Sequence, residues 1–385
     1  MKTLSPIVCI LLCYLFPMVG EAQEDAWQLM RRGEALFQEK QYEQSRTFYD
    51  QAKALYIERN DWDSLTVASL AVIYTFIYER NLDATFKAFE QIFEHYSSRA
   101  LAPSFYLAKA FALQAYVYNR KGNLSASLQA YEQAIDIYDE LGTNHYHVAY
   151  IYRNAAMILM RRQDYQKTIR YLKTALQRDS TGEYKASIYS QLAHCNLYIP
   201  NVDETLKYCH LGIQYQQEKE NYREKNRDLA FLQWIAGSAY LEQKNYVKAD
   251  SLSKAALSFY QNGDSFWSYR MFIYISLAKL NQELKNDQRA EEYFQQAMAE
   301  KKAYAKYKDR DFASLYTAVS DFYFQTGHLD KALEYTQKAL QQIFPKFNEN
   351  NFLANPSLDA VYPEPWIMSV TDQKGKVLLA LYQKN

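Results

Sequence analysis

The sequence predicts an all-α protein: a right-handed solenoid of antiparallel helix pairs, with about eight repeats and a terminal half-repeat. Two observations predict it. A short pattern, a polar turn followed by an apolar residue, recurs along the chain, and small residues lie at fixed distances from each occurrence. Glycine (10 residues) and proline (8) are also scarce among the 385 residues, which disfavours folds that depend on many tight turns.

The recurring turn sets the period of the array. From Tyr42 to Leu329 is 287 residues in seven steps, a mean period of 41. A fixed period of about 20 to 50 residues is typical of stacked structural repeats. We therefore expect a repeat array over residues 25–346. The positions that follow the turn are Tyr42, Leu82, Leu124, Tyr165, Val202, Tyr246, Asp287 and Leu329, of which Asp287 breaks the apolar pattern.

Small residues predict how the two helices of each repeat touch. Ser45 and Ala52, seven residues apart, lie on one face of a second helix, and Gly33 stands twelve residues before Ser45 in the first helix. The other repeats follow this spacing, with Ile73 and Ile92 as the exceptions. Small residues let antiparallel helices approach closely. We interpret the 36 tyrosines as packing around this seam rather than as an aromatic ligand cage.

The first 22 residues have the pattern of a secretory signal peptide. Lys2 precedes an apolar run from Leu4 to Val19, and Gly20-Glu21-Ala22 provides a small-residue cleavage site. The run is shorter than the roughly 20 residues that a comfortable bilayer span needs, although an uncleaved anchor stays an alternative. We expect an exported protein, periplasmic or secreted, without a membrane span after cleavage.

The repeats resemble the tetratricopeptide repeat (TPR), a helix–turn–helix unit that stacks into a superhelix. The resemblance rests on motifs such as residues 243–249 and 326–332, and it covers about residues 25–346. The period of 41 is longer than the family's usual ~34 residues, which longer helices or loops would explain. The resemblance implies the fold strongly and the function weakly, because such arrays serve many partners.

After residue 346 the pattern changes. Residues 347–365 read as a loop by composition, and residues 366–385 as a terminal helix, in which Gly375 is a candidate seam residue of a ninth unit. This helix resembles the first half of a repeat. It would cap the array, dock another chain, or continue into a longer protein.

The tail also carries a second resemblance. The loop at residues 344–352, the Asn355-Pro356 pair and the Lys374-Gly375-Lys376 helix resemble the repeat region of bacterial CHAT-domain proteins. In that family a caspase-like peptidase domain follows the repeats. No segment of this chain matches that domain, so no catalytic residue is carried over.

The composition gives little sign of chemistry. Lysine plus arginine and aspartate plus glutamate both number 44, a balance that argues against nucleic-acid binding. Cys195 and Cys209 are either two buried thiols or a disulfide. With His194 and His210 they are the only candidate metal cluster. Adjacent helical residues point about 100° apart, which disfavours one zinc ion. We expect no metal, no cofactor and no Cys/His nucleophile.

The concave surface of the array is the expected binding site. Lys109, Arg120, Arg153 and Arg161 would make it locally basic, suited to a carboxylate or an acidic peptide, unless they form an ordinary solvated helix face. The candidate groove residues are Lys109, Tyr116, Arg120, Arg153, Asn154, Arg161, His194 and Trp234.

We therefore expect a non-enzymatic, exported scaffold that binds a peptide or protein segment in this groove. Two alternatives stay open. The chain is the regulatory arm of a CHAT-type peptidase whose catalytic domain is missing or separately encoded, or it is the extracytoplasmic sensor half of a signalling system.

Overall fold

The computed structural model describes residues 21–143, 146–199, 201–218, 225–261, 266–304, 310–344, 346–357 and 365–384. Within these ranges the structure is helical, with seventeen α-helices and no strand. The expected all-α class is confirmed. The expected signal peptide falls almost wholly on residues 1–20, which lie outside the described residues, and Glu21 and Ala22 begin the first described helix.

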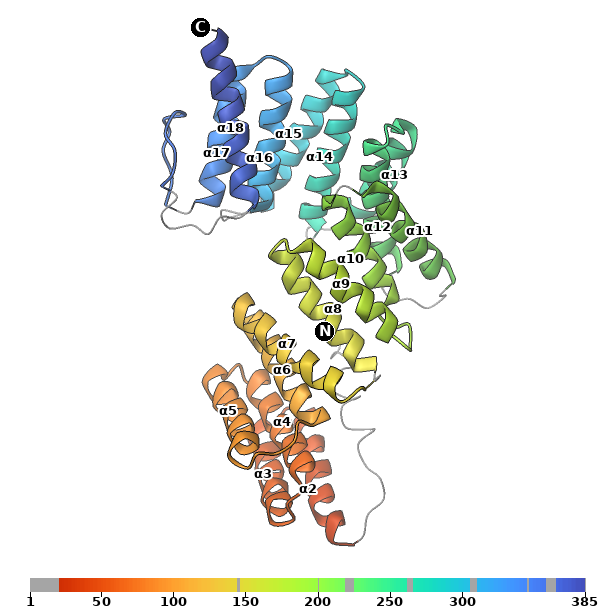
Figure 1. Ribbon diagram of the computed structural model, residues 1–385, viewed down its shortest axis with the longest axis vertical. Helices are drawn as coiled ribbons and strands as arrows, with labels where there is room; N and C mark the ends of the chain where they lie inside the picture. The colour runs from red at the N-terminus through yellow and green to blue at the C-terminus, as the bar shows by residue number, and fades with distance from the viewer. Residues whose placement is uncertain are drawn as a thin grey trace. The chain divides into compact units, whose positions relative to one another are not determined.

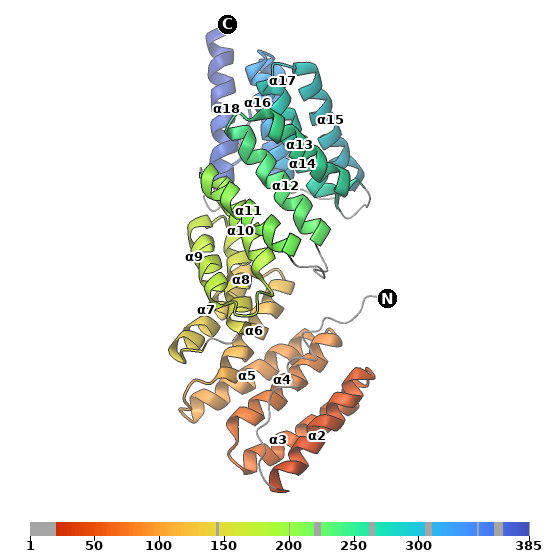
Figure 2. The ribbon, with the colours of Figure 1, turned by 90° about the vertical axis from the view of Figure 1, so that its right-hand side faces the viewer.

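Within each of the two compact parts of the chain, consecutive helices pack as antiparallel pairs, which run side by side in Figures 1 and 2. Eight consecutive pairs are followed by one further helix. They are α2 (Glu21–Gln38) and α3 (Tyr42–Glu58); α4 (Trp62–Tyr78) and α5 (Leu82–Ser98); α6 (Phe105–Arg120) and α7 (Leu124–Glu140); α8 (Tyr146–Arg161) and α9 (Tyr165–Arg178); α10 (Lys185–Tyr198) and α11 (Val202–Glu218); α12 (Lys225–Glu242) and α13 (Tyr246–Tyr260); α14 (Trp267–Glu283) and α15 (Asp287–Tyr304); α16 (Arg310–Gln325) and α17 (Leu329–Ile343); then α18 (Pro365–Lys384).

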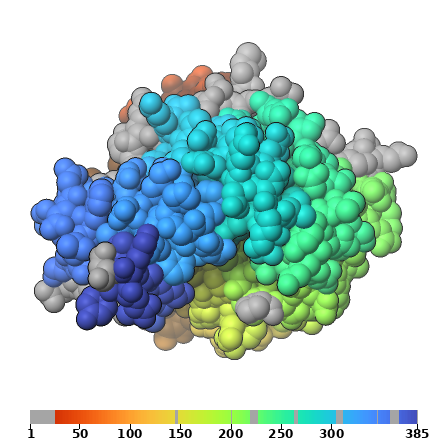
Figure 3. Space-filling view, turned by 90° about the horizontal axis from the view of Figure 1, so that it is seen from above, coloured from red at the N-terminus to blue at the C-terminus, as the bar shows by residue number. Residues whose placement is uncertain are grey.

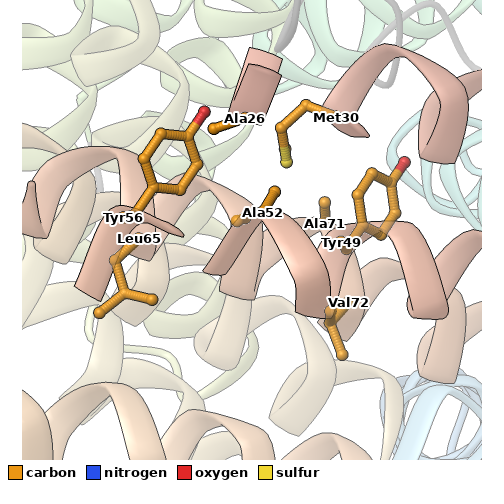
Figure 4. Packing of buried hydrophobic residues seen from close by; sticks show 9 residues of the cluster. Ala26, Met30, Tyr49, Ala52, Tyr56, Leu65, Ala71 and Val72 are labelled. Carbon is orange, nitrogen blue, oxygen red and sulfur yellow. The ribbon is translucent and has the colours of Figure 1, made fainter. Parts of the chain in front are cut away.

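The chain divides into two compact units, Met1–Ile158 and Leu159–Asn385. The boundary falls within α8, so the first unit holds α2 to α7 and most of α8. Its core begins with a cluster between α2, α3 and α4, drawn in Figure 4. There Tyr49 and Tyr56 of α3 flank the fully buried Ala52, and Ala26 and Met30 of α2 complete the cluster. The tyrosine rings in this cluster thus serve packing.

Each expected turn begins a second helix. All eight positions that the sequence pattern singled out, including Asp287, are the first residue of α3, α5, α7, α9, α11, α13, α15 or α17. The preceding residue is the N-cap. In six cases it is Asn or Asp, whose side-chain oxygen accepts a hydrogen bond from the amide three residues on. Local cap chemistry therefore fixes the start of these helices.

The residue before the cap closes the first helix. It adopts a left-handed backbone at every described turn within a pair: φ is 64° at Lys40, 59° at Arg80 and 82° at Gly122, for example. The amide of the following cap residue then donates to a carbonyl five residues back, as Asn123 does to Tyr118 at 3.0 Å. This is the Schellman arrangement, and it satisfies carbonyls that the helix end leaves open.

The helix seam shows the expected close approach. An ideal Cβ placed on Gly33 would lie 2.5 Å from Cε1 of Tyr49 and one on Gly237 2.8 Å from Oγ of Ser253, so only glycine fits at either position without a shift. Serine hydroxyls also bond across the seam, twelve residues away in sequence. These bonds run from Ser45 Oγ to Gly33 O (2.7 Å), from Ser127 Oγ to Ala115 O (2.8 Å) and from Ser320 Oγ to Ala332 O (2.8 Å).

At the end of the second unit, α18 packs against α17 and α16 through Ile367 and Val370. Figure 3 shows it as a dark blue ridge beside the blue surface of α16 and α17. Gly375 is exposed, and a Cβ on it would meet nothing within 4 Å. No helix of the described residues packs on that side, so the expectation that Gly375 is the seam residue of a ninth unit stays a prediction.

Lys374, which precedes Gly375, is a buried charged residue of this helix, with 2% of its surface exposed. Its Nζ donates to Gln337 Oε1 at 2.8 Å and to Ala354 O at 2.6 Å. Gln337 in turn donates from Nε2 to the carbonyls of Glu349 and Asn351, both at 3.0 Å. Burial lowers the pKa of Lys374 to about 8. Lys374 thus ties α18 to α17 and to the intervening loop.

Candidate binding groove in the first unit

A groove of about 420 Å³ opens on the first unit, between the first helices of three successive repeats. Pockets of about 300 to 1,000 Å³ are typical of small-ligand sites. The groove lies within the first unit alone. Its lining residues are Leu70, Tyr74, Ile77, Tyr78 and Arg80 of α4 and its turn, Lys109, Ala112, Leu113, Tyr116 and Arg120 of α6, and His147, Tyr150 and Ile151 of α8.

The helical period explains why α6 contributes five residues. Lys109, Tyr116 and Arg120 are seven and eleven residues apart, which is close to two and three full turns, so they share one face. Ala112 and Leu113 lie between them on the same face. Ala115, which accepts the seam hydrogen bond from α7, lies on another side of α6, about 100° around the helix from Tyr116. One helix thus packs the repeat with one side and lines the groove with another.

Charge in the groove is of one sign. Arg80, Lys109 and Arg120 line it, and no aspartate or glutamate does. Within the part of the chain that the structure describes, none of the three makes an ion pair. Glu79, next to Arg80, is bound instead by Arg46 at 2.6 Å. The groove therefore presents positive charge without an internal counter-ion.

Lys109 lies in the least hydrated surroundings of the three. Its Nζ lies 4.7 Å from the centre of the Phe105 ring and 5.8 Å from that of Tyr106. Burial disfavours the charged form and lowers the pKa of Lys109 to about 8. An anion bound beside it would favour the charged form further and raise this pKa. Lys109 is thus the cation of the groove that gains most from an anionic ligand.

Four tyrosines complete the lining, grouped around Tyr74. Burial raises the pKa of the Tyr74 hydroxyl above its usual range, and the hydroxyls of Tyr150, Tyr78 and Tyr116 add to the effect. The Tyr74 hydroxyl has no hydrogen-bond partner among the described residues. Tyr78 is held by edge contact with Phe37 at 5.2 Å, and 39% of Tyr116 is exposed. The groove thus offers aromatic faces and hydroxyl groups to a ligand.

The structure brings Lys109, Tyr116 and Arg120 of the expected site together. Arg153 and Asn154 lie half-buried on α8 outside the lining, and Arg153 contacts the ring of Tyr150 at 6.0 Å. The other three expected residues, Arg161, His194 and Trp234, belong to the second unit. The first unit therefore holds a compact subset of the expected residues.

In the second unit, Arg161 is an exposed residue at the end of α8. His194 and Trp234 belong to an aromatic cluster with Phe231, which lies 5.4 Å from His194 and 5.5 Å from Trp234. Burial lowers the pKa of His194 to about 4. Trp234 is 6% exposed, and its Nε1 donates to Ser276 Oγ at 3.1 Å. These two side chains are core-packed in this structure.

Sequence reasoning missed the groove residues outside α6. Arg80 stands in a turn, and Tyr74, Tyr78, His147 and Tyr150 sit among many similar aromatic residues. A helical-phase count on α4 would have found part of the set, since Leu70, Tyr74 and Tyr78 recur every four residues. The contribution of α8 depends on how three helices converge, which no local pattern contains.

Cys195 and Cys209 are unpaired and buried, and burial raises the pKa of each thiol to about 12. No group of three or more His, Cys, Asp or Glu side chains in the described ranges is placed to hold a metal ion. None of the described helices combines the length and apolar character that a bilayer crossing requires.

Comparison with known proteins agrees with the repeat pattern. The family model described as tetratricopeptide repeat matches residues 108–140 and 313–342, which cover α6–α7 and α16–α17. No curated protein sequence matches this chain.

Solved structures show the same fold at low identity. RapI in its apo form is 14% identical with a TM-score of 0.57, covering 93% of this chain and 98% of its own. A tetratricopeptide repeat protein from Parabacteroides merdae is 12% identical with a TM-score of 0.53, covering 81% and 98%. NprR in complex with its cognate peptide NprX is 12% identical with a TM-score of 0.51, covering 69% and 78%.

The paired helices, the capped turns, the matched repeats and these structural likenesses agree. The CHAT-type resemblance of the tail has no counterpart among them. Two segments of the chain, residues 108–140 and 313–342, thus match the tetratricopeptide repeat, and the described helices share the fold of these α-solenoid structures.

Proposed function

We propose that the protein is a non-enzymatic scaffold that binds a peptide or protein segment, and that the groove on α4, α6 and α8 is its recognition site. The observation that carries the proposal is the lining: three cations without a carboxylate among them, around an apolar and tyrosine-rich floor. Such a surface suits an anionic segment with apolar side chains. The complex of NprR with its peptide supports this use of a similarly folded chain.

The fold favours a peptide over a folded ligand surface as the first contact. The first helices of three successive repeats line the groove, so it runs across three repeats of the first unit. Backbone amides in the helices are already bonded, and recognition must come from side chains. Tyrosine supplies contact area with few torsions to immobilise. This lining thus supports side-chain recognition without a chemical step.

The test uses a library of short random peptides selected on the purified protein. The variant Arg80→Gln/Arg120→Gln removes two groove charges, and Arg32→Gln/Arg59→Gln removes two exposed charges of the same unit outside the groove. Selected peptides should bind the groove variant at least about tenfold more weakly and the control variant as tightly as the unchanged protein. Equal binding to both variants, with helicity intact by circular dichroism, would contradict the proposal.

Export is part of the same proposal and rests on the N-terminal 22 residues alone. Fractionation of cells that produce the native chain, with N-terminal sequencing of the mature protein, tests it. A mature terminus at Gln23 in the exported fraction is the expected result. Full-length chain that stays in the cytoplasm contradicts it.

Two alternative functions are the regulatory arm of a CHAT-type peptidase and the extracytoplasmic sensor half of a signalling system. The first rests on the tail motifs, and sequencing the locus beyond codon 385 tests it. The described residues favour neither alternative over the scaffold.

A further inference from the structure

We propose that the groove measures the spacing of two acidic groups: its ligand is an extended peptide whose carboxylates stand about five residues apart, with apolar side chains between them. This inference rests on the proposed function, because it specifies which peptide the same groove accepts. It follows from where the three cations lie along α6 and α4.

The cations lie at two separate levels of the groove. Lys109 is in the first turns of α6, and Arg120 is the last residue of that helix, on the same face. Eleven residues at 1.5 Å each separate them by about 16 Å along the helix axis. Arg80 lies two residues beyond the last residue of α4, in the turn after its C-cap Glu79, so it joins Arg120 at the far level. The groove therefore has one cation at one level and two at the other.

The stretch between the two levels is uncharged. Leu70, Ile77, Ala112, Leu113 and Ile151 supply apolar surface, and the tyrosines supply rings and hydroxyls. His147 lies at the start of α8, where Tyr138 Oη contacts its Nδ1 at 3.4 Å. A ligand with acidic groups in the middle would place charge on this apolar stretch, which costs free energy. Acidic groups are therefore favoured at the ends of the ligand and apolar side chains between them.

Backbone geometry fixes the number of residues. An extended chain rises about 3.3 Å per residue, so about five residues cover the 16 Å between the two levels. A helical ligand would need eleven residues for the same rise and is about 10 Å across with its side chains. A groove of about 420 Å³ is too small for that helix. The ligand is thus expected to bind in an extended form.

A spacing series tests the inference directly. The probes are fluorescein-labelled peptides with blocked termini and two glutamates three, five or seven positions apart, joined by alternating leucine and serine. All three carry the same charge, so non-specific attraction is equal. Fluorescence anisotropy should show the five-position peptide binding about tenfold more tightly than the other two. A further peptide with a free carboxyl end in place of the second glutamate tests whether a chain terminus serves as one of the two acids.

A double-mutant comparison locates each acid. Lys109→Gln should remove the preference for five-position spacing. When the glutamate that pairs with Lys109 is replaced by glutamine in that peptide, the affinity should fall much less for this variant than for the unchanged protein. Arg59→Gln is the charge-matched control and should keep the preference.

The outcomes separate the two proposals. Equal affinity across the spacing series overturns the proposal that the groove selects a spacing of about five residues. The groove stays a peptide site if the affinity of library peptides still depends on Arg80 and Arg120. Failure of every series peptide and every library peptide overturns both.

Discussion

The substitution Gly33→Ala gives the sharpest test of the helix seam. The added Cβ would lie 2.5 Å from Cε1 and 2.7 Å from Cδ1 of Tyr49, where carbon atoms in contact normally lie about 3.5–4.0 Å apart. Tyr49 is 1% exposed, and Ser45 Oγ holds the Gly33 carbonyl at 2.7 Å, so neither helix can easily withdraw. Overpacking of this kind typically costs about 1–3 kcal/mol.

Alanine also favours the helix over glycine, by about 1 kcal/mol. The net expectation for Gly33→Ala is a loss of up to about 2 kcal/mol in the free energy of unfolding. Gly375→Ala is the matched control, because its Cβ meets nothing within 4 Å. That change should raise stability by up to about 1 kcal/mol.

Urea unfolding followed by far-ultraviolet circular dichroism compares the two variants, and hydrogen exchange of the α2 and α3 amides localises the effect. Opposite signs are expected. If Gly33→Ala stabilised the protein as much as Gly375→Ala, the close approach of α2 and α3 would be refuted.

Three further predictions concern the turns, the tail and the thiols. Asn123→Ala should lower the free energy of unfolding by about 1 kcal/mol, because it removes the cap hydrogen bond of α7. Gln41→Asn should raise it, because Gln41 caps α3 without a side-chain hydrogen bond. The midpoints of urea unfolding of the two variants test both expectations. The pKa of Lys374 is about 8 when folded against about 10.4 unfolded, so at this group the unfolded state binds more protons between these values. The stability of the unchanged protein relative to Lys374→Met should therefore rise from pH 8 to 9.5, as urea unfolding at each pH will show. Cys195 and Cys209 should resist iodoacetamide in the folded protein and react after unfolding, as peptide mapping by mass spectrometry will show.

The fold was predictable because its signals are local. A capping Asn123 or Asp164 and the residue after it determine where a helix starts, whatever packs on that helix later. The pattern even placed the start of α15 at Asp287, although this residue lacks the apolar character of its counterparts. Hydrogen bonds within one turn decide such boundaries, and one sequence contains them.

The candidate site was predictable only along a single helix. The 3.6-residue repeat of a helix predicts that Lys109, Tyr116 and Arg120 share one face of α6, and the structure places them together in the groove. Arg80 and Tyr150 join them through the packing of α4 and α8 on α6, which depends on contacts between helices.

The left-handed turns have a consequence for how such an array can change its specificity. Gly122 and Gly327 occupy this backbone position in two turns, and Arg80 occupies it in another with φ of 59°. Glycine would be the less strained choice at position 80, by roughly 1 kcal/mol. The strained arginine places a guanidinium at the rim of the groove, outside any helix, where its exchange leaves the packed seam untouched. The residue at such a turn position can be replaced without disturbing the packing between helices. A single substitution there can therefore add or remove a contact with a ligand while the fold stays the same.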